Sequence, residues 1–338
     1  MSAGPRILVV APSWIGDAIL SQPMLALLKG QDPASRIDVL APAWALPIYR
    51  RMPEVAQTLE SPFAHGELAL GARFRLARTL RHHRYDKAYV LPNSFKSALS
   101  PFLARIPERI GYIGELRFGL LTDARRLEKS KFPRMVERFA QLAGARDATL
   151  AQPLPTPRLV VTDAERGALI SRLGLDARRP VCLCPGAEYG PAKRWPVEYF
   201  SDLAIHLAAQ DRAVWIMGSA RETKLGETIQ TATGRAVNLC GKTTLDEATV
   251  LLSAADMVVA NDSGLMHVAA ALNRPMVALY GSSSPDFTPP LSANARIVRM
   301  QVPCSPCFER VCPLQHFDCM MKLKPDRVLD EIKRFSAP

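Results

Sequence analysis

Short apolar runs alternate with amphipathic segments along most of the chain. The strand-length runs are typical of buried strands, at residues 6–12, 37–41, 87–91, 181–184, 213–217, 236–239, 257–260 and 276–280. Segments with helical spacing fall between them, at residues 18–29, 47–52, 76–83, 94–104, 164–173, 197–210, 223–231, 245–254, 264–272 and 326–335. Strands that alternate with helices predict an α/β protein with parallel, doubly wound sheets.

The pattern occurs twice, and the two series are separated by a stretch rich in Pro and Thr at residues 147–160. A chain of 338 residues is also longer than a single core usually becomes, since cores rarely grow past about 250–300 residues. We therefore predict two Rossmann-like domains that face a central cleft, at residues 1–160 and 161–325. A final helix at 326–338 is expected to pack back on the first domain.

The charge balance indicates an anionic partner. The formal net charge is +11, with basic clusters at residues 73–84 and 105–138, which fits a nucleic acid, an acidic lipid or a phosphorylated substrate. A merely solvated basic surface is the alternative. The sequence has no zinc-finger spacing, no RNA-binding aromatic signature and no basic region beside a heptad, so we predict no nucleic-acid partner. No apolar run reaches the length of a membrane span or signal peptide, so a cytoplasmic protein is expected.

The first motif that could take part in catalysis or binding is residues 13–17, Ser-Trp-Ile-Gly-Asp, directly after the first predicted strand. Ser13 and Gly16 would shape a tight loop in which a ligand comes close to the backbone. Asp17 at a strand's carboxyl edge is a candidate general base for an acceptor hydroxyl. The alternative is a helix-capping or first-turn aspartate with no catalytic part.

Two further loops follow strands in the second half. Residues 185–196 contain Gly186, Glu188 and Lys193, and two glycines with two cations suit a phosphate, although the order is neither that of a Walker A loop nor G-x-G-x-x-G. Residues 261–267 place Asp262, Ser263, Gly264, Leu265 and His267 at a predicted helix start, where the helix dipole favours an anion. Solvated cations in the first loop and a packed histidine in the second are the alternatives.

Four cysteines cluster near the C-terminus with the spacing C-x2-C-x4-C-x6-C: Cys304, Cys307, Cys312 and Cys319. In a cytoplasmic protein such clustering makes a structural zinc site a candidate, although the spacing departs from the usual paired C-x2-C arrangement. Reduced or partly disulfide-bonded cysteines, or an iron–sulfur cluster, are the alternatives. Cys182, Cys184 and Cys240 fall in apolar runs and are predicted to be reduced core thiols.

The long motifs PSWIGDAILSQP, PGAEYGPAKRWP and NDSGLMHVAAALNRPMVALYGSSSPDFTPP resemble those of the ADP-heptose:lipopolysaccharide heptosyltransferases. The stretches RMPEV, YVLPNSFKSAL and GYIGELRFGLL resemble the heptosyltransferase II branch. The resemblance implies a GT-B fold and inverting transfer of L-glycero-D-manno-heptose from ADP-heptose to the first heptose of heptosyl-Kdo-lipid A. It implies no cofactor for catalysis.

The resemblance also implies residue roles. Asp17 matches the presumed base, and Lys193 matches a cation that holds the donor diphosphate. The positions that match donor contacts are Glu222, Lys242, Thr243, Asp262, Ser263, Gly264, Leu265 and His267. The lipid-linked acceptor implies peripheral association with the anionic inner face of the inner membrane. Basic residues such as Arg73, Arg75, Arg78, Arg81 and Arg84 would mediate it, and their spacing puts several of them on one helical face.

Three alternatives stay open at this point. A related enzyme, such as a heptosyltransferase I or another core glycosyltransferase, would have the same motifs. A non-catalytic nucleotide-sugar- or lipid-binding protein could share the fold, although intact Asp17, Lys193 and Asp262 argue against it. A dinucleotide oxidoreductase is disfavoured because G-x-G-x-x-G is absent.

Overall fold

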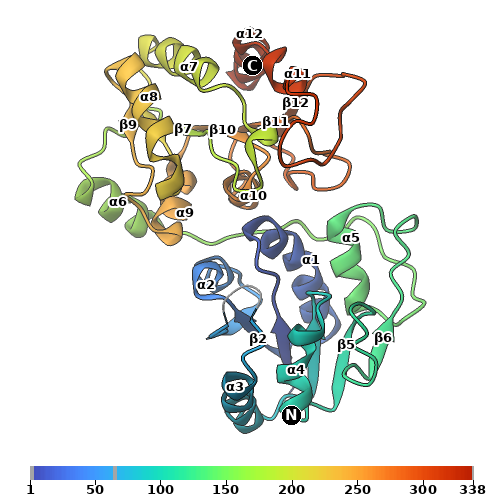
Figure 1. Ribbon diagram of the computed structural model, residues 1–338. Coiled ribbons are helices and arrows are strands. Elements are labelled where there is room, and N and C mark those ends of the chain that lie inside the picture. The colour runs from blue at the N-terminus through green and yellow to red at the C-terminus, as the bar shows by residue number, and fades with distance from the viewer. Residues whose placement is uncertain (1–3, 64–66, 337–338) are drawn as a thin grey trace. The chain divides into compact units, whose positions relative to one another are not determined.

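The computed structural model describes residues 4–63 and 67–336 and contains two compact units. The contacts within the chain divide it between Pro157 and Arg158, three residues before the boundary that the sequence predicted. Each unit contains one six-stranded parallel sheet with helices around it, as Figure 1 shows. The predicted α/β class with two doubly wound units is confirmed.

The first unit has the strand order β3-β2-β1-β4-β5-β6. Its strands are β1 (Arg6–Val10), β2 (Arg36–Ala41), β3 (Val55–Glu60), β4 (Lys87–Val90), β5 (Glu108–Tyr112) and β6 (Asp123–Arg125). Its helices are α1 (Ile15–Gln31), η1 (Ala43–Ala45), α2 (Leu46–Arg50), α3 (Leu70–His82), α4 (Phe95–Leu103), α5 (Met135–Ala140) and η2 (Gln141–Ala143). All neighbouring strands are parallel, so the loops that follow β1 and β4 lie at one edge of the sheet.

The second unit has the strand order β12-β11-β10-β7-β8-β9. Its strands are β7 (Val181–Cys184), β8 (Val214–Ile216), β9 (Val237–Asn238), β10 (Met257–Asn261), β11 (Met276–Tyr280) and β12 (Ala295–Arg299). Its helices are α6 (Asp163–Arg172), η3 (Pro191–Lys193), α7 (Val197–Ala209), η4 (Ala220–Glu222), α8 (Thr223–Thr233), α9 (Leu245–Ala254), α10 (Gly264–Ala271), α11 (Asp318–Met321) and α12 (Pro325–Ser336). Strands β7 and β10 are neighbours, which places the loops after them side by side.

The expectation that the last helix packs on the first domain is wrong. Val328 and Ile332 of α12 are buried in the core of the second unit, and the helix contacts α7, β11 and β12. The physical reason is local: Trp195 donates its indole N–H to the carbonyl of Leu323 at 2.6 Å, which brings the chain against this sheet just before α12 begins. The amphipathic helix then buries its apolar stripe on the nearest core.

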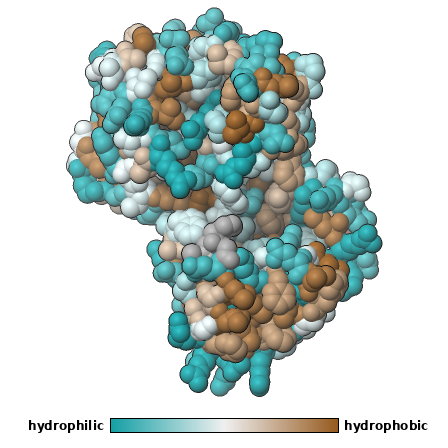
Figure 2. All heavy atoms as spheres, viewed as in Figure 1, coloured by the Kyte–Doolittle hydropathy of each residue, from teal (hydrophilic) through white to brown (hydrophobic). Residues whose placement is uncertain are grey.

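Part of the surface of the first unit is apolar. Figure 2 shows hydrophobic residues gathered on one face of this unit, over α4. None of the described helices is long and apolar enough to cross a membrane.

Candidate functional site

Asp17 lies in the first turn of α1, immediately after β1 and its short loop. Trp14 is the N-cap residue of this helix, and its side chain makes no capping hydrogen bond. Asp17 is therefore not the N-cap residue, but it occupies the first-turn position that the structural alternative also allowed, where a carboxylate interacts favourably with the helix dipole. Asp17 also lines a pocket.

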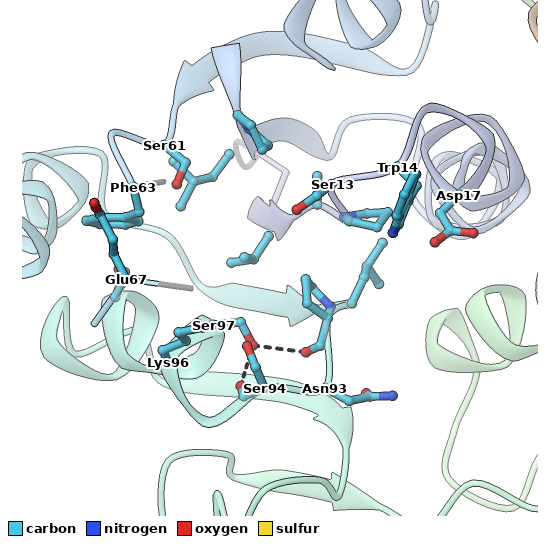
Figure 3. Close-up of a pocket in the computed structure, with 18 of the residues that line it drawn as sticks. Ser13, Trp14, Asp17, Ser61, Phe63, Glu67, Asn93, Ser94, Lys96 and Ser97 are labelled. Atoms are coloured by element: carbon cyan, nitrogen blue, oxygen red, sulfur yellow. Dashed lines mark hydrogen bonds between the residues drawn. The ribbon is translucent and has the colours of Figure 1, made fainter. Parts of the chain in front are cut away.

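This pocket lies entirely in the first unit and has a volume of about 500 Å³. Figure 3 shows its walls, which come from the loop after β1, the loop after β4 and the start of α4. Its polar lining includes Ser13, Asp17, Asn93, Ser94 and Lys96. Trp44 donates its indole N–H to the carbonyl of Ser13 at 3.1 Å and so fixes the β1 loop. The lining carries both charges, because Glu67 and Glu115 lie in it as well as Asp17, Lys96 and the buried Arg73. Its hydroxyl and charged groups suit a hydroxylated, polar ligand.

Arg73 does not belong to the predicted basic surface of α3. Its side chain is buried, and its guanidinium donates to the carbonyls of Leu68 and Lys96 and stacks over the Phe63 ring at 4.0 Å. Burial lowers the pKa of Arg73 below its usual value. Arg75, Arg78, Arg81 and Arg84 are exposed as predicted. The sequence pattern did not reveal the buried position of Arg73, because an arginine that binds backbone carbonyls has the same sequence signature as a solvent-exposed one.

In the second unit, Asn261 at the end of β10 holds the loop of residues 185–196 at both ends. Its side-chain amide donates to the carbonyl of Pro185 at 2.8 Å and accepts from the backbone N–H of Trp195 at 3.1 Å. The side chain of Trp195 is almost completely buried. The loop is therefore pinned to the carboxyl edge of the sheet, and η3 presents Lys193 there.

Lys193 and Asp262 form the central pair of this site. Lys193 Nζ lies 2.5 Å from Asp262 Oδ2, and the two side chains are 16% and 4% exposed. The hydroxyl of Ser283 also donates to Asp262 Oδ2. A cation and a carboxylate that converge at the start of α10 are placed to bind a phosphate and a sugar hydroxyl respectively.

Two polar atoms beside this pair have no hydrogen-bond partner. They are Ser263 Oγ and His267 Nδ1, both buried, while His267 Nε2 lies 4.0 Å from Asp262 Oδ1. Buried polar groups are nearly always paired in folded proteins. Unpaired atoms at a helix N-terminus, next to a buried Lys–Asp pair, indicate that the site is completed by a ligand.

His267 is expected to make the stability of the second unit pH-dependent. Burial, opposed by the charge of Asp262 and aided by Lys193, lowers the pKa of His267 to about 4. The unfolded chain therefore binds more protons than the folded chain between pH 6.5 and 4, and folding loses stability as the pH falls through this window. The loss is about 3 kcal/mol at 1.36 kcal/mol per pKa unit. Urea unfolding at several pH values should show this slope, and the slope should be shallower in His267→Gln; identical slopes would contradict it.

The remaining residues predicted for the donor site and the phosphate loop differ in burial and in hydrogen-bond partners. Glu222 is buried, and its carboxylate accepts from the backbone and hydroxyl of Ser219, so it caps η4. Gly186 is required beside it, because a Cβ there would lie 2.6 Å from Glu222 Cδ. Glu188 is exposed and pairs with Arg221. The others lie in loops or at helix starts: Lys242 is exposed, and Thr243, Ser263, Gly264 and Leu265 are half-buried.

Sequence reasoning missed two residues beside Lys193: Tyr189 of the same loop and Arg310 of the C-terminal loop. Tyr189 has its ring 4.9 Å from Lys193 Nζ and 5.4 Å from the Arg310 guanidinium. Arg310 donates to the carbonyl of Tyr189 at 2.7 Å, and its own carbonyl accepts from Ala192 at 3.1 Å. Gly190 permits this contact, because a Cβ would lie 2.3 Å from the Arg310 oxygen. No motif signalled this contact across 121 residues.

The four C-terminal cysteines lie together, three of them in the loop before α11 and Cys319 in α11 itself. Cys304, Cys307, Cys312 and Cys319 line one cavity of about 30 Å³. Burial, and then the proximity of the other three thiols, raises the pKa of Cys319 to about 11. Across residues 4–63 and 67–336, however, no group of three or more His, Cys, Asp or Glu side chains is arranged to hold a metal ion. The geometry therefore does not support the structural zinc site that the spacing suggested.

Known proteins match this chain over most of its length. The family model of glycosyltransferase family 9 (heptosyltransferase) matches residues 73–318. The lipopolysaccharide heptosyltransferase 2 of Salmonella typhimurium is 46% identical over 340 residues, which covers 97% of each protein. The lipooligosaccharide heptosyltransferase 2 of Haemophilus influenzae is 46% identical over 308 residues and covers 87% of this chain and 88% of that protein.

Solved structures agree in fold. The ADP-heptose lipopolysaccharide heptosyltransferase II of Escherichia coli superposes with a TM-score of 0.88 at 43% identity, over 97% of this chain and 98% of that chain. A family 9 glycosyltransferase from Veillonella parvula has a TM-score of 0.83 at 19% identity, over 99% and 98%; at that identity the likeness concerns the fold alone.

Two parallel sheets and a Lys–Asp pair at a helix N-terminus, together with these matches, define a glycosyltransferase with the GT-B fold. The chain belongs to glycosyltransferase family 9, the heptosyltransferases. The predicted family and enzyme class are confirmed.

Proposed function

We propose that this enzyme transfers L-glycero-D-manno-heptose from ADP-heptose to the first heptose of heptosyl-Kdo-lipid A, with inversion at the anomeric carbon. The observation that carries the proposal is the Lys193–Asp262 pair at the start of α10, with the unpaired Ser263 Oγ and His267 Nδ1 beside it. The similarity to heptosyltransferases 2 supports the choice of donor and acceptor.

The donor roles follow from the chemistry of the second unit. Lys193 would neutralise the diphosphate and stabilise departing ADP, while the N-terminus of α10 offers backbone N–H groups at Ser263 and Gly264. Asp262 accepts hydrogen bonds and would orient the heptose hydroxyls. Because Lys193 and the helix N-terminus supply a positive field of their own, we propose that transfer needs no cofactor. Glu222, Lys242, Thr243, Leu265 and His267 stay proposals as donor contacts, and Gly186 and Glu188 as parts of the phosphate loop.

The acceptor role falls to the first unit. Asp17 would take the proton from the acceptor hydroxyl while that oxygen attacks the anomeric carbon and the bond to ADP breaks. Ser13 and Gly16 belong to the same loop, and Lys96 adds a positive charge to the pocket that would hold the phosphorylated, carboxylate-bearing acceptor. A lipid-linked acceptor places the enzyme at the inner face of the inner membrane, so we propose a cytoplasmic, peripheral location.

The experiment is mass spectrometry of core oligosaccharide from a strain that lacks the gene. We expect the second heptose to be lost while the first is retained, and the wild-type gene to restore it. An expressed Asp17→Ala gene is the matched control and should fail to restore it. Loss of both heptoses would instead assign the chain to the first transfer, and an unchanged core would sink the proposal.

A further inference from the structure

The loop between β5 and β6 has its charged side chain inside and its apolar side chains outside. Arg117 is 1% exposed, whereas its neighbours Leu116 and Phe118 are 81% and 64% exposed. This reverses the usual distribution, in which arginine is almost never fully buried and large apolar groups are covered. A loop built this way presents apolar groups at the surface, which raises the question of what partner covers them.

Arg117 acts as an internal anchor for this loop. It donates from Nε to the carbonyl of Tyr112 at 2.9 Å, from Nη1 to the carbonyl of Pro92 at 2.6 Å, and from Nη2 to the side chain of Asn93 at 3.3 Å. Burial, opposed by the charge of Glu115, lowers the pKa of Arg117 to about 10. These bonds hold Arg117 inside the loop, while Leu116 and Phe118 on either side of it are exposed.

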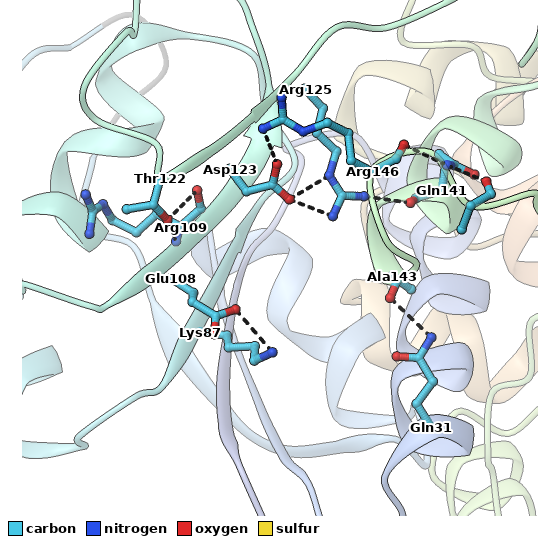
Figure 4. Close-up of polar contacts among 11 residues, drawn as sticks. Gln31, Lys87, Glu108, Arg109, Thr122, Asp123, Arg125, Gln141, Ala143 and Arg146 are labelled. Carbon is cyan, nitrogen blue, oxygen red and sulfur yellow. Dashed lines mark hydrogen bonds and ion pairs between the residues drawn. The ribbon is translucent and has the colours of Figure 1, made fainter.

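Ion pairs join the strands on either side of the loop to their surroundings (Figure 4). Glu108 of β5 lies 3.1 Å from Lys87 of β4, and Asp123 of β6 lies 2.7 Å from Arg125 and 2.8 Å from Arg146. The loop therefore starts and ends at strands that are tied to their neighbours.

Further exposed apolar groups lie on helices α3 and α4 of the same unit. Phe95 and Phe102 of α4 are 40% and 41% exposed, and Phe74 of α3 is 57% exposed. The backbone N–H of Phe95 donates to Glu115 at 2.8 Å, which joins α4 to the loop. The hydrophobic area in Figure 2 lies over α4. Large exposed apolar patches mark sites of interaction with protein or membrane.

The positive charge of this part of the chain favours a membrane over a protein partner. Residues 67–131 contain 14 Lys and Arg against six Asp and Glu, in a chain whose net charge is +11, although Arg73, Arg117 and Arg125 are buried. The exposed cations include Arg75, Arg78, Arg81, Arg84 and Arg105. Apolar groups surrounded by cations are typical of surfaces that bind anionic lipid, where the cations meet headgroups and the apolar groups enter the boundary with the acyl chains.

We propose that residues 113–120 form a lipid-docking loop, which inserts Leu116 and Phe118 into the interface of an anionic bilayer. The proposal rests on the proposed function, because a lipid-linked acceptor requires the enzyme at a membrane. Asn93 and Glu115 connect the two sites: both line the acceptor pocket, and both bond to the loop or to its partner α4. Docking would therefore bring the bilayer surface to the acceptor pocket.

Vesicle flotation tests the loop directly. The probes are vesicles of phosphatidylethanolamine with and without phosphatidylglycerol, and the variant is Leu116→Ser/Phe118→Ser. The matched control is Ile205→Ser/Ile297→Ser, which removes two half-exposed apolar groups (46% and 43%) from the second unit. We expect the wild type and the control to float with anionic vesicles and the loop variant to bind about tenfold or more weakly. Equal flotation of the loop variant and the wild type overturns the proposal.

Transfer assays separate this proposal from the proposed function. On a deacylated, water-soluble acceptor the loop variant should have wild-type kcat/KM, whereas on acceptor embedded in vesicles it should lose activity in step with its flotation. If the wild type transfers heptose to neither acceptor, the proposed function fails, and flotation alone decides the loop. If sedimentation shows a wild-type dimer that the loop variant converts to a monomer, with flotation unchanged, the patch is a self-association surface and the lipid proposal is wrong.

Discussion

Asp17→Ala is expected to lower kcat for heptose transfer by about 10²–10⁴-fold while ADP binding is unchanged, because general base catalysis typically contributes that much. Asp17 lies in the first turn of α1 and lines the proposed acceptor pocket, whereas the groups proposed to bind ADP lie in the other unit. Steady-state kinetics on a defined acceptor and calorimetry with ADP measure the two quantities.

A matched control separates catalysis from helix stability. Glu198 is an exposed carboxylate in the first turn of α7, so Glu198→Ala removes a comparable interaction with a helix dipole, about 0.3–1 kcal/mol, without touching the pocket. We expect its kcat to equal that of the wild type. If Asp17→Ala behaves in the same way, the carboxylate only stabilises α1, and the base is another group.

Lys193→Ala is expected to lower kcat/KM for the donor by about 10²–10³-fold, the usual cost of removing one stabilising donor from a developing anion. The ammonium group is directed at Asp262 and stacked on Tyr189, so its position is fixed before the donor binds. Lys193→Arg should restore part of the activity, because it restores the charge with a different shape.

Stability must be measured alongside this variant. Removing Lys193 leaves the buried Asp262 carboxylate with Ser283 but without its cation, and such losses cost about 3–5 kcal/mol. Circular dichroism at the assay temperature therefore has to show folded protein. Lys224→Ala removes an exposed lysine from the same unit and should leave kcat/KM unchanged. Wild-type donor kinetics in folded Lys193→Ala would refute the assignment.

The elements that sequence predicted best are the fully buried central strands. Strands β1, β4, β7, β10 and β11 consist mainly of continuous apolar runs. Asp17, Lys193 and Asp262 lie in the segments that follow β1, β7 and β10, so predicting these strands also located the three residues. Strands β3, β5, β6 and β12 were missed, because polar or partly exposed positions interrupt each of them and leave no continuous apolar run. Periodicity reports burial, and only indirectly strand formation.

Buried arginines show the second limit of the sequence. Arg73 and Arg117 are bonded mainly to backbone carbonyls, and backbone acceptors carry no sequence signature. The same holds for the contact of Arg310 with the Lys193 loop, which involves main-chain atoms on both sides. By contrast, Asn93, Ser94 and Lys96 of the proposed acceptor pocket lie in the stretch YVLPNSFKSAL. The family resemblance of this stretch could have indicated a binding site, but it was used only to assign the branch of the family.

The most direct test of the account is transfer by the purified enzyme, with ADP-heptose as donor and heptosyl-Kdo-lipid A as acceptor. Mass spectrometry of the product should show the addition of one heptose to the first heptose, with one ADP released for each heptose transferred. Release of ADP without a glycosylated product, or transfer to Kdo-lipid A that lacks the first heptose in preference to this acceptor, would contradict it.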